Sequence, residues 1–214
     1  MRNKYLNAFY WILSCLPLFF ALLFLPALPP KIPSHYDMTG SVTQWGSKYE
    51  SLIMPIITLA TAILFHSLVK KSKHKNEKLY FYIGFSLVIL FGSMSVFFLY
   101  ANINSIENIN DIHFFEILSL IISFSYIIIG NILPKCQPDK LLGFKTKWTL
   151  SSPEIWKKTH RFAGRMFILG AVIQMIIVQI KLTPNPFIVV LFVRIIIVSI
   201  CFIYSIYLYR KEHR

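Results

Sequence analysis

Residues 80–101 read YFYIGFSLVILFGSMSVFFLYA and contain no charged side chain. A hydrocarbon core about 30 Å thick is crossed by roughly 20 apolar residues at about 1.5 Å of rise each, so this stretch can span a bilayer as one helix. The whole chain has the same character, because its 214 residues are 56% hydrophobic and only 14% charged, with a mean hydropathy of +0.59. This composition is typical of integral membrane proteins.

Five further apolar runs are long enough for the same role. The six windows are about 8–28, 52–69, 80–101, 113–133, 164–180 and 187–208. The first follows Arg2 and Lys4 like a signal peptide, but it continues past Pro26 without a small-x-small cleavage site, so we expect it to be retained. We therefore predict an all-α integral membrane protein with six transmembrane helices.

Basic residues are distributed unevenly between the connecting segments. Of the 22 Lys and Arg residues, 18 lie in the segments that share a side with the amino terminus, and three, Lys31, Lys48 and Lys181, lie on the other side. The positive-inside rule then places both termini of a multi-pass membrane protein in the cytoplasm. It also accounts for the net charge of +13 without a nucleic acid, and we expect no direct nucleic-acid partner.

The order of spans suggests two parts. Residues 1–69 form a two-span module with an outer loop at 29–50, and residues 70–214 form a four-span region with a cytoplasmic loop at 134–165. The last two spans meet through KLTPNP, residues 181–186, where two prolines predict a tight outer turn.

The outer loop 29–50 has two interpretations. It is an ordered hairpin at the membrane surface, or a connector with aromatic residues at the lipid interface. Prolines exclude a helix at its start, glycines mark turns, and two aromatic side chains suit the interface: Pro29, Pro30, Pro33, Gly40, Gly46, Trp45 and Tyr49.

Neither metal nor enzyme chemistry is indicated. His35 has only Asp37 beside it at ligand spacing, which favours a hydrogen-bonded histidine over a metal ligand. Cys15, Cys136 and Cys201 lack metal or disulfide spacing. HExxH and GxSxG motifs are absent from the sequence, so we expect no cofactor and no enzymatic activity.

The inner segment GFKTKWTLSSPEIWKKTHRFAGR, residues 143–165, is too polar to span the membrane. A helix is predicted to begin near residue 152, either with Ser151 and Glu154 as a capping box or with Ser152 as cap and Pro153 at the first helical position. We expect it to lie along the inner leaflet before turning into the fifth span. Gly143 permits a turn, and the alternation over 144–148 suggests an extended piece.

Helical periodicity divides this segment into two faces. Trp156, His160, Ala163 and Phe167 form one stripe, and the basic side chains lie nearly opposite. The basic arc would face anionic lipids of the inner leaflet or a protein partner. The candidate docking residues are Gly143, Lys145, Thr146, Trp148, Trp156, Lys157, His160 and Arg161.

Arg194 is the one charge well inside a span, roughly 10 Å from the outer end of the sixth window. Charged residues at such depth face the bundle and have partners. Glu116 is the best candidate by depth and Gln174 is another. Arg194 is then a clamp between helices, or it lines a polar pocket that receives part of a ligand.

Two segments resemble a known family. The outer segment LPPKIPSHYDMTGSVTQWGSK, residues 28–48, is similar to the amino-terminal module of unknown function (DUF1648 type) found in SdpI-type membrane proteins. The inner segment, residues 130–167, resembles the SdpI segment itself. The matching positions include Ile32, Pro33, His35, Trp45 and Gly46 in the first, and Gly130, Asn131, Gly143, Trp148, Trp156, His160 and Gly164 in the second.

This resemblance implies a six-span bacterial immunity protein. Such a protein protects the producing cell against a secreted antimicrobial peptide toxin, and it also signals by capturing a cytoplasmic transcriptional repressor when toxin is bound. A small transporter of a peptide or lipid-like compound and a structural membrane partner are the alternatives. The expected toxin-binding residues at the outer face are Ile32, Pro33, His35, Tyr36, Gly40, Trp45, Glu116 and Arg194.

Overall fold

Six long helices dominate the computed structural model, which describes residues 4–72, 76–138, 142–181 and 186–212. All six are long and apolar enough to cross a membrane, which confirms the predicted six-span fold. The expected turn at 181–186 lies mostly outside the described residues. The helices are α1 (Lys4–Phe24), α2 (Ile53–Lys71), α3 (Glu77–Ile103), α4 (Phe114–Ile132), α5 (Pro153–Gln179) and α6 (Pro186–Glu212).

The helix α5 begins eleven residues before the apolar window that predicted the fifth span. The Oγ atom of Ser152 accepts the backbone N–H of Glu154 at 3.2 Å and Pro153 is the first helical residue, so the second of the two predicted caps is the one formed. At about 1.5 Å per residue, 27 residues measure about 40 Å, more than the hydrocarbon core needs. The polar first turns therefore extend α5 in one continuous helix, and the expected turn at the membrane surface is absent.

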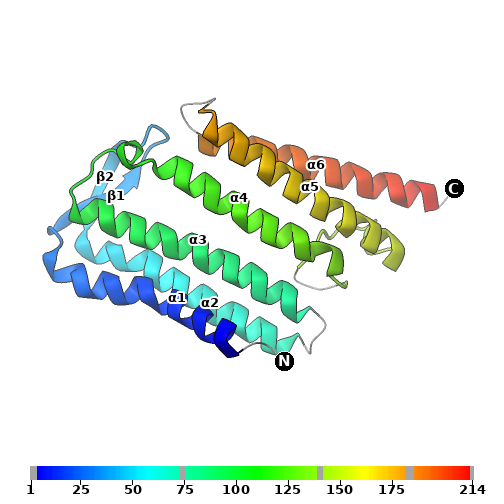
Figure 1. Ribbon diagram of the computed structural model, residues 1–214, viewed down its shortest axis with the longest axis horizontal. Helices are drawn as coiled ribbons and strands as arrows, with labels where there is room; N and C mark the ends of the chain where they lie inside the picture. Colours follow the sequence, from blue (N-terminus) through cyan, green and yellow to red (C-terminus); the bar gives the residue numbers. More distant parts are fainter. Residues whose placement is uncertain (1–3, 73–75, 139–141, 182–185, 213–214) are drawn as a thin grey trace.

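The helices form two groups of three. In Figure 1, α1, α2 and α3 pack together on one side and α4, α5 and α6 on the other, with α3 beside α4. The first group encloses a cluster that includes Tyr10, Phe65 and Phe81, and the hydroxyl of Tyr10 donates to the carbonyl of Ala62 at 3.0 Å. The second group encloses Leu133, Ala163 and Ile197.

The outward faces of the helices are apolar. On α6 the side chains of Phe192, Ile195 and Ile203 are each more than 60% exposed. Contiguous apolar surface of this kind is unfavourable in water and ordinary against lipid tails. The chain is a multi-pass membrane protein.

Two glycines allow α4 and α5 to approach closely. A Cβ atom added at Gly130 would lie 2.8 Å from the carbonyl oxygen of Gly164, and one added at Gly164 would lie 2.5 Å from the carbonyl oxygen of Gly130. Small residues at such crossings let two backbones come into contact in a membrane. The pair fixes α5 against α4 next to the inner loop.

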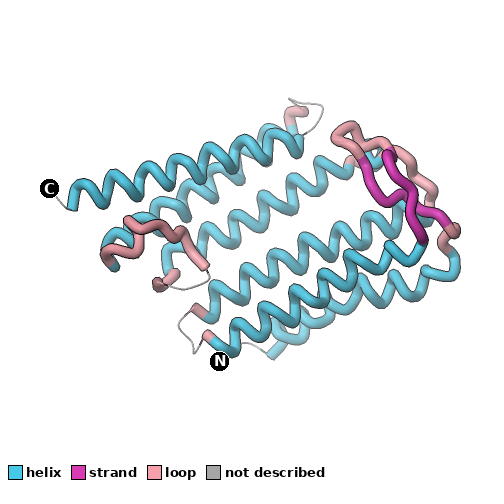
Figure 2. Tube along the Cα trace, turned by 180° about the vertical axis from the view of Figure 1, so that it is seen from behind, coloured by secondary structure: helices cyan, strands magenta, loops and turns pink. Residues whose placement is uncertain are grey.

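A two-stranded antiparallel hairpin covers one end of the bundle, as Figure 2 shows. It consists of β1 (Lys31–Tyr36) and β2 (Val42–Ser47), with Pro33 opposite Trp45 and His35 opposite Gln44. Of the two interpretations of residues 29–50, the structure supports the ordered hairpin. Short 3-10 helices complete the connections at Leu25–Ala27, Lys48–Leu52, Ile109–Ile112 and Leu133–Lys135.

Candidate functional site

A cavity of about 300 Å³ lies beneath the hairpin, between β1, the start of α2 and the α3 end near Asn102. Its walls are mainly apolar, with Ile32, Phe98 and Leu99 among them. The volume suits one large side chain or one small molecule. The other lining residues are Pro33, Ser34, His35, Tyr36, Glu50, Ser51, Ile53, Met54, Ser95 and Asn102.

Polar atoms with unused hydrogen-bonding capacity face this region. The hydroxyl of Tyr36 and the Oδ1 atom of Asn102 are buried and have no hydrogen-bond partner among the described residues. The ring of Tyr36 stacks on Phe98 with centroids 5.9 Å apart, and burial raises the pKa of Tyr36 to about 12. Because unsatisfied buried polar groups are costly, a ligand that bonds to them gains affinity and specificity.

The carboxylate of Glu50 closes one side of the cavity. Its Oε2 atom accepts from Ser34 Oγ at 2.5 Å and its Oε1 atom accepts the backbone N–H of Ser47 at 3.1 Å. It therefore connects both strands to the turn that leads into α2. The cavity wall is held by these bonds before any ligand binds.

The hairpin is attached to the loop between α3 and α4. The backbone N–H of Val42 donates to Glu107 at 3.2 Å, and that of Ile109 donates to Gly40 at 2.8 Å. The side chain of Asn110 also donates to the carbonyl of Thr39. These contacts join the two predicted parts of the chain at the hairpin end of the bundle, and no sequence pattern indicated them.

The structure places four of the predicted outer-face residues around the cavity: Ile32, Pro33, His35 and Tyr36. Gly40 is buried at the attachment to the α3–α4 loop. Trp45 is 51% exposed on β2 and is not part of the cavity lining. Glu116 and Arg194 belong to the second group of helices and do not line the cavity.

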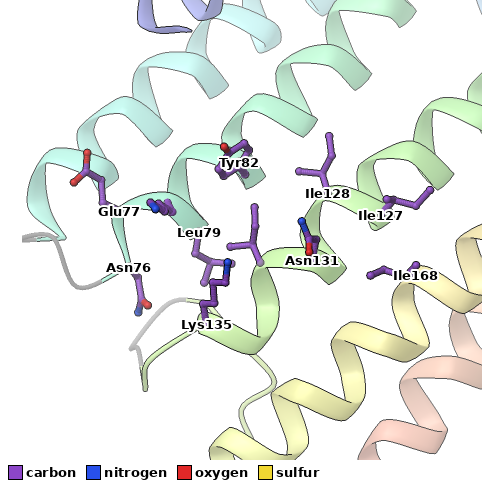
Figure 3. A pocket seen from close by; sticks show the side chains of 11 residues that line it. Asn76, Glu77, Leu79, Tyr82, Ile127, Ile128, Asn131, Lys135 and Ile168 are labelled. Atoms are coloured by element: carbon purple, nitrogen blue, oxygen red, sulfur yellow. The ribbon is translucent and has the colours of Figure 1, made fainter. Parts of the chain in front are cut away.

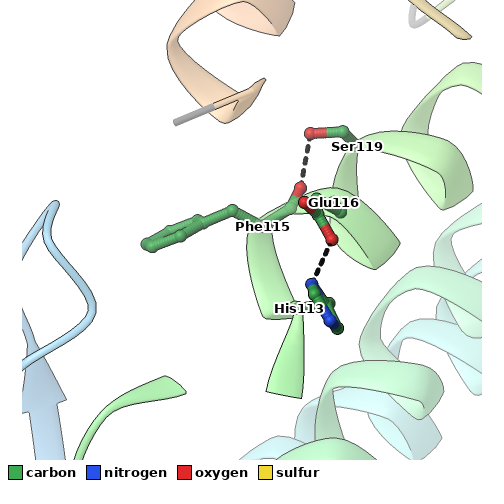
Figure 4. Close-up of polar contacts among 4 residues, drawn as sticks. All are labelled: His113, Phe115, Glu116 and Ser119. Carbon is green, nitrogen blue, oxygen red and sulfur yellow. Dashed lines mark hydrogen bonds and ion pairs between the residues drawn. The ribbon is translucent and has the colours of Figure 1, made fainter. Parts of the chain in front are cut away.

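Glu116, the first-ranked of the two predicted partners of Arg194, does not pair with it. The Oε2 atom of Glu116 lies 2.5 Å from the Nδ1 atom of His113, the residue before α4 (Figure 4). One turn deeper, the Oγ atom of Ser119 donates to the carbonyl of Phe115 at 2.5 Å. Glu116 is thus engaged within its own helix, three residues from its partner.

Arg194 instead binds Gln174, the second predicted partner, with Nη2 and Oε1 2.6 Å apart. Its guanidinium also lies 3.5 Å above the centre of the Tyr126 ring. Gln174 in turn donates to the carbonyl of Ser119 at 3.1 Å, so one polar chain connects α4, α5 and α6. These contacts fit the predicted role of a helix clamp without a carboxylate. They leave the buried Nε and Nη1 atoms of Arg194 without a hydrogen-bond partner among the described residues.

At the opposite end of the bundle, two predicted docking residues are buried, which corrects their assignment to a surface. The Nε1 atom of Trp156 donates to the carbonyl of Cys136 at 2.8 Å. The Nε2 atom of His160 accepts the backbone N–H of Phe144 at 2.9 Å, while its Nδ1 atom lies 2.9 Å from the carbonyl of Trp156. Trp156 and His160 therefore hold the inner loop in place.

These partners determine the tautomer of His160. A backbone carbonyl only accepts and a backbone N–H only donates, so Nδ1 carries the proton and Nε2 is the acceptor. Gly143 has φ +114°, and a Cβ atom there would lie 2.7 Å from the Trp156 ring. The loop thus needs glycine at this position for both conformation and space.

The loop before α5 is a compact turn. Lys147–Ser151 form turns, so the predicted extended piece does not continue through 148. The Oγ1 atom of Thr149 donates to the carbonyl of Phe144 at 2.8 Å and accepts the backbone N–H of Thr146 at 2.8 Å. The predicted docking residues that remain accessible are Gly143, Lys145, Thr146, Trp148, Lys157 and Arg161.

Three residues of these sites escaped sequence reasoning. Asn102 and Glu50 line the cavity beneath the hairpin. The sequence signal for Asn102 was a polar residue at the end of an apolar run, and that for Glu50 was a carboxylate at the end of a proline-rich loop. Tyr126 carries no pattern that distinguishes it from other aromatic residues in the spans. Its position over Arg194 follows from helix packing alone.

Two segments of the chain match models of known protein families. Residues 135–205 match the model of the SdpI/YfhL protein family, and residues 12–59 match the domain of unknown function DUF1648. The resemblance drawn from the sequence is confirmed: the chain is a multi-pass protein of the cell membrane that is similar to SdpI-type proteins in these two segments.

The chain is similar to a curated relative over most of its length. It is 25% identical over 158 residues, 74% of each chain, to the immunity protein SdpI of Bacillus subtilis (strain 168). No solved structure matches the chain.

Proposed function

We propose that this chain is a membrane immunity protein that protects its cell against a secreted antimicrobial peptide by binding the peptide at the outer face. The observation that carries the proposal is the similarity to an immunity protein over three quarters of both chains. The cavity under the hairpin supports it, because it offers an apolar recess with two unsatisfied polar atoms at the end of the bundle predicted to face outward.

The cavity is too small for a whole peptide, so one side chain or one terminus of the toxin enters it. The rest of the peptide lies on the exposed apolar residues of the loop. Met38, Trp45 and Tyr49 are each more than half exposed there. Buried anchors surrounded by a peripheral contact surface are the usual arrangement of binding energy at protein interfaces.

A survival assay tests the binding site. A sensitive host expressing the full chain is challenged with culture supernatant of the strain that encodes it, and we expect at least tenfold higher survival than without the chain. Ser95→Phe fills the outer cavity and should abolish most of this gain. Ser93→Phe makes the same change on the same helix against α1, outside the cavity, and should preserve it.

Two further variants separate the contributions of other predicted residues. Trp45→Ala removes an exposed contact without altering the cavity, so it should weaken protection less than Ser95→Phe. Arg194→Ala removes the clamp between α4, α5 and α6, and it should reduce survival at an unchanged protein level. Survival that is unchanged by expression of the chain at a verified membrane level would contradict the immunity function.

We also propose that the inner loop captures a cytoplasmic repressor when the toxin is bound. Lys145, Lys147, Lys157 and Arg161 are exposed around it, and Leu150 is 57% exposed among them. A basic loop repels the basic DNA-binding face of a repressor, so docking uses an acidic or apolar surface of that protein. In the same strains, we expect a DNA-binding regulator to copurify with the chain when toxin is present. The double variant Lys145→Glu/Lys147→Glu should lose this copurification.

A further inference from the structure

A second and larger cavity, of about 700 Å³, lies between α3 and α4 at the end of the bundle opposite the hairpin. Figure 3 shows Tyr82 on α3 facing Asn131 and Ile128 on α4, with Ile168 of α5 behind. This is the end at which most of the basic residues of the chain gather. The toxin-binding proposal does not use this cavity.

The lining changes from charged to apolar in the same direction on both helices. Lys78 lies in the first turn of α3, and Lys135 ends the short 3-10 helix that follows α4. Four residues deeper, or about 6 Å along each helix, are Tyr82 and Asn131. Beyond these the lining is aliphatic: Ile127, Ile128 and Ile168.

This order matches the parts of a phospholipid at the boundary of a bilayer. A phosphate lies at the surface, the glycerol and ester oxygens lie below it, and the acyl chains lie deeper. A lysine on each wall suits the phosphate, and an amide and a phenol suit the ester oxygens. A free phosphate would leave the isoleucines uncovered, and an uncharged hydrocarbon would leave the two ammonium groups without a partner.

The charge balance of the cavity favours an anion. Lys78 and Lys135 form no ion pair with a carboxylate among the described residues. Glu77 is the acidic residue of the lining, and in Figure 3 its carboxylate points away from Asn131 and Lys135. The polar lining residues therefore carry one net positive charge.

The polar edge of the cavity is also held in place. The side chain of Asn76 accepts the backbone N–H of Gln137 and donates to the carbonyl of the same residue, each at 3.0 Å. These two bonds fix the start of α3 to the segment that follows α4. The two lysines are thus carried on helix ends whose separation is set by the fold.

We propose that this cavity binds one anionic phospholipid of the inner leaflet. The phosphate lies between the ammonium groups of Lys78 and Lys135, the ester oxygens meet Asn131 and Tyr82, and one acyl chain lies along the isoleucines. Diffuse attraction to an anionic leaflet acts on every nearby lysine, wherever it lies on the protein. A specific lipid site differs from this diffuse attraction, because only the lysines at the cavity then affect retention of the bound lipid.

Native mass spectrometry of the full-length protein purified with phosphatidylglycerol and phosphatidylcholine tests the site. We expect one retained phosphatidylglycerol per chain. Lys78→Ala/Lys135→Ala should lower the retained fraction at least fivefold. The matched control Lys70→Ala/Lys71→Ala removes two exposed lysines from the last turn of α2. They lie at the same end of the bundle as the cavity but do not line it, so lipid retention should be unchanged.

A second pair of variants tests the acyl chain without altering charge. Ile128→Trp fills the cavity and should reduce phosphatidylglycerol retention, while Ile176→Trp on a lipid-exposed part of α5 should not. Equal losses in the two lysine pairs would overturn the proposal in favour of diffuse attraction. Equal retention in all variants, or equal retention of phosphatidylcholine by the unaltered chain, would also overturn it.

Discussion

At the scale of single residues, His160 determines the shape of the inner loop. Sequence reasoning placed it on a stripe with Trp156 and assigned both to a docking surface, because an amphipathic helix before a span has one face for lipid and one for a partner. Periodicity identified the stripe correctly and could not tell what covers it. The chain covers it with its own loop, through the bond from Phe144 to His160.

Replacement of His160 by Phe should loosen this loop. The buried N–H of Phe144 then loses its acceptor, which costs about 1–3 kcal/mol. We expect hydrogen exchange of the Phe144 amide to accelerate at least tenfold, the factor that about 1.4 kcal/mol gives. Lys157→Ala, at an exposed position of the same helix, is the control. An exchange rate that stays at the wild-type value would show that the loop is held by other contacts.

Arg194 shows a similar limit of residue-level reasoning. Depth along the span correctly indicated a partner inside the bundle, but it ranked Glu116 above Gln174. The structure satisfies Glu116 with His113 and gives Arg194 an amide and an aromatic ring. Depth along a span does not reveal which helix faces turn toward each other. The amide of Gln174 binds only Nη2, and the Nε and Nη1 atoms of Arg194 have no hydrogen-bond partner among the described residues.

At the scale of elements, six apolar windows identified six helices and misjudged their ends. The start of α5 was best indicated by its cap and not by hydropathy, because polar residues continue a helix as readily as apolar ones do. The hairpin was predicted from prolines, glycines and aromatics. Its attachment to residues 107–110 was not, since that loop has no periodicity and most of its bonds to the hairpin are made by backbone groups.

The hairpin turn should respond to acid through Asp37. Its Oδ1 atom accepts the N–H groups of Thr39 and Ser41, at 2.8 and 3.0 Å, and the hydroxyl of Thr39 at 2.6 Å. These bonds, that of the Thr39 side chain first, hold the pKa of Asp37 below its usual value. A depressed pKa means that the carboxylate stabilises the turn at neutral pH and that this stabilisation is lost as the pH falls through the depressed value.

The amide proton shifts of Thr39 and Ser41, measured by NMR on the solubilised chain, should therefore titrate with a midpoint below that of an ordinary aspartate. Asp37→Asn retains an acceptor oxygen but cannot titrate, so the same shifts should stay constant over that range. A midpoint at or above the ordinary aspartate value would contradict the capping role of the carboxylate.

At the scale of the whole molecule, two ends with different chemistry face opposite sides of the membrane. The hairpin end carries the apolar cavity with its unsatisfied polar atoms, and the other end carries the basic loop and the cavity with two lysines. The polar chain from Ser119 through Gln174 to Arg194 connects α4, α5 and α6 between them. The division at residue 69/70 remains a prediction, since α2 and α3 pack against each other across it.

Both proposals depend on the orientation given by the positive-inside rule. Membrane-impermeant thiol labelling of intact cells measures it, in a chain whose Cys15, Cys136 and Cys201 are replaced by serine. Gln44→Cys and Ser151→Cys each place one thiol at an exposed position, on the hairpin and on the inner loop respectively. We predict that position 44 reacts in intact cells and position 151 reacts only after permeabilisation. Labelling of 151 with protection of 44 would contradict the account.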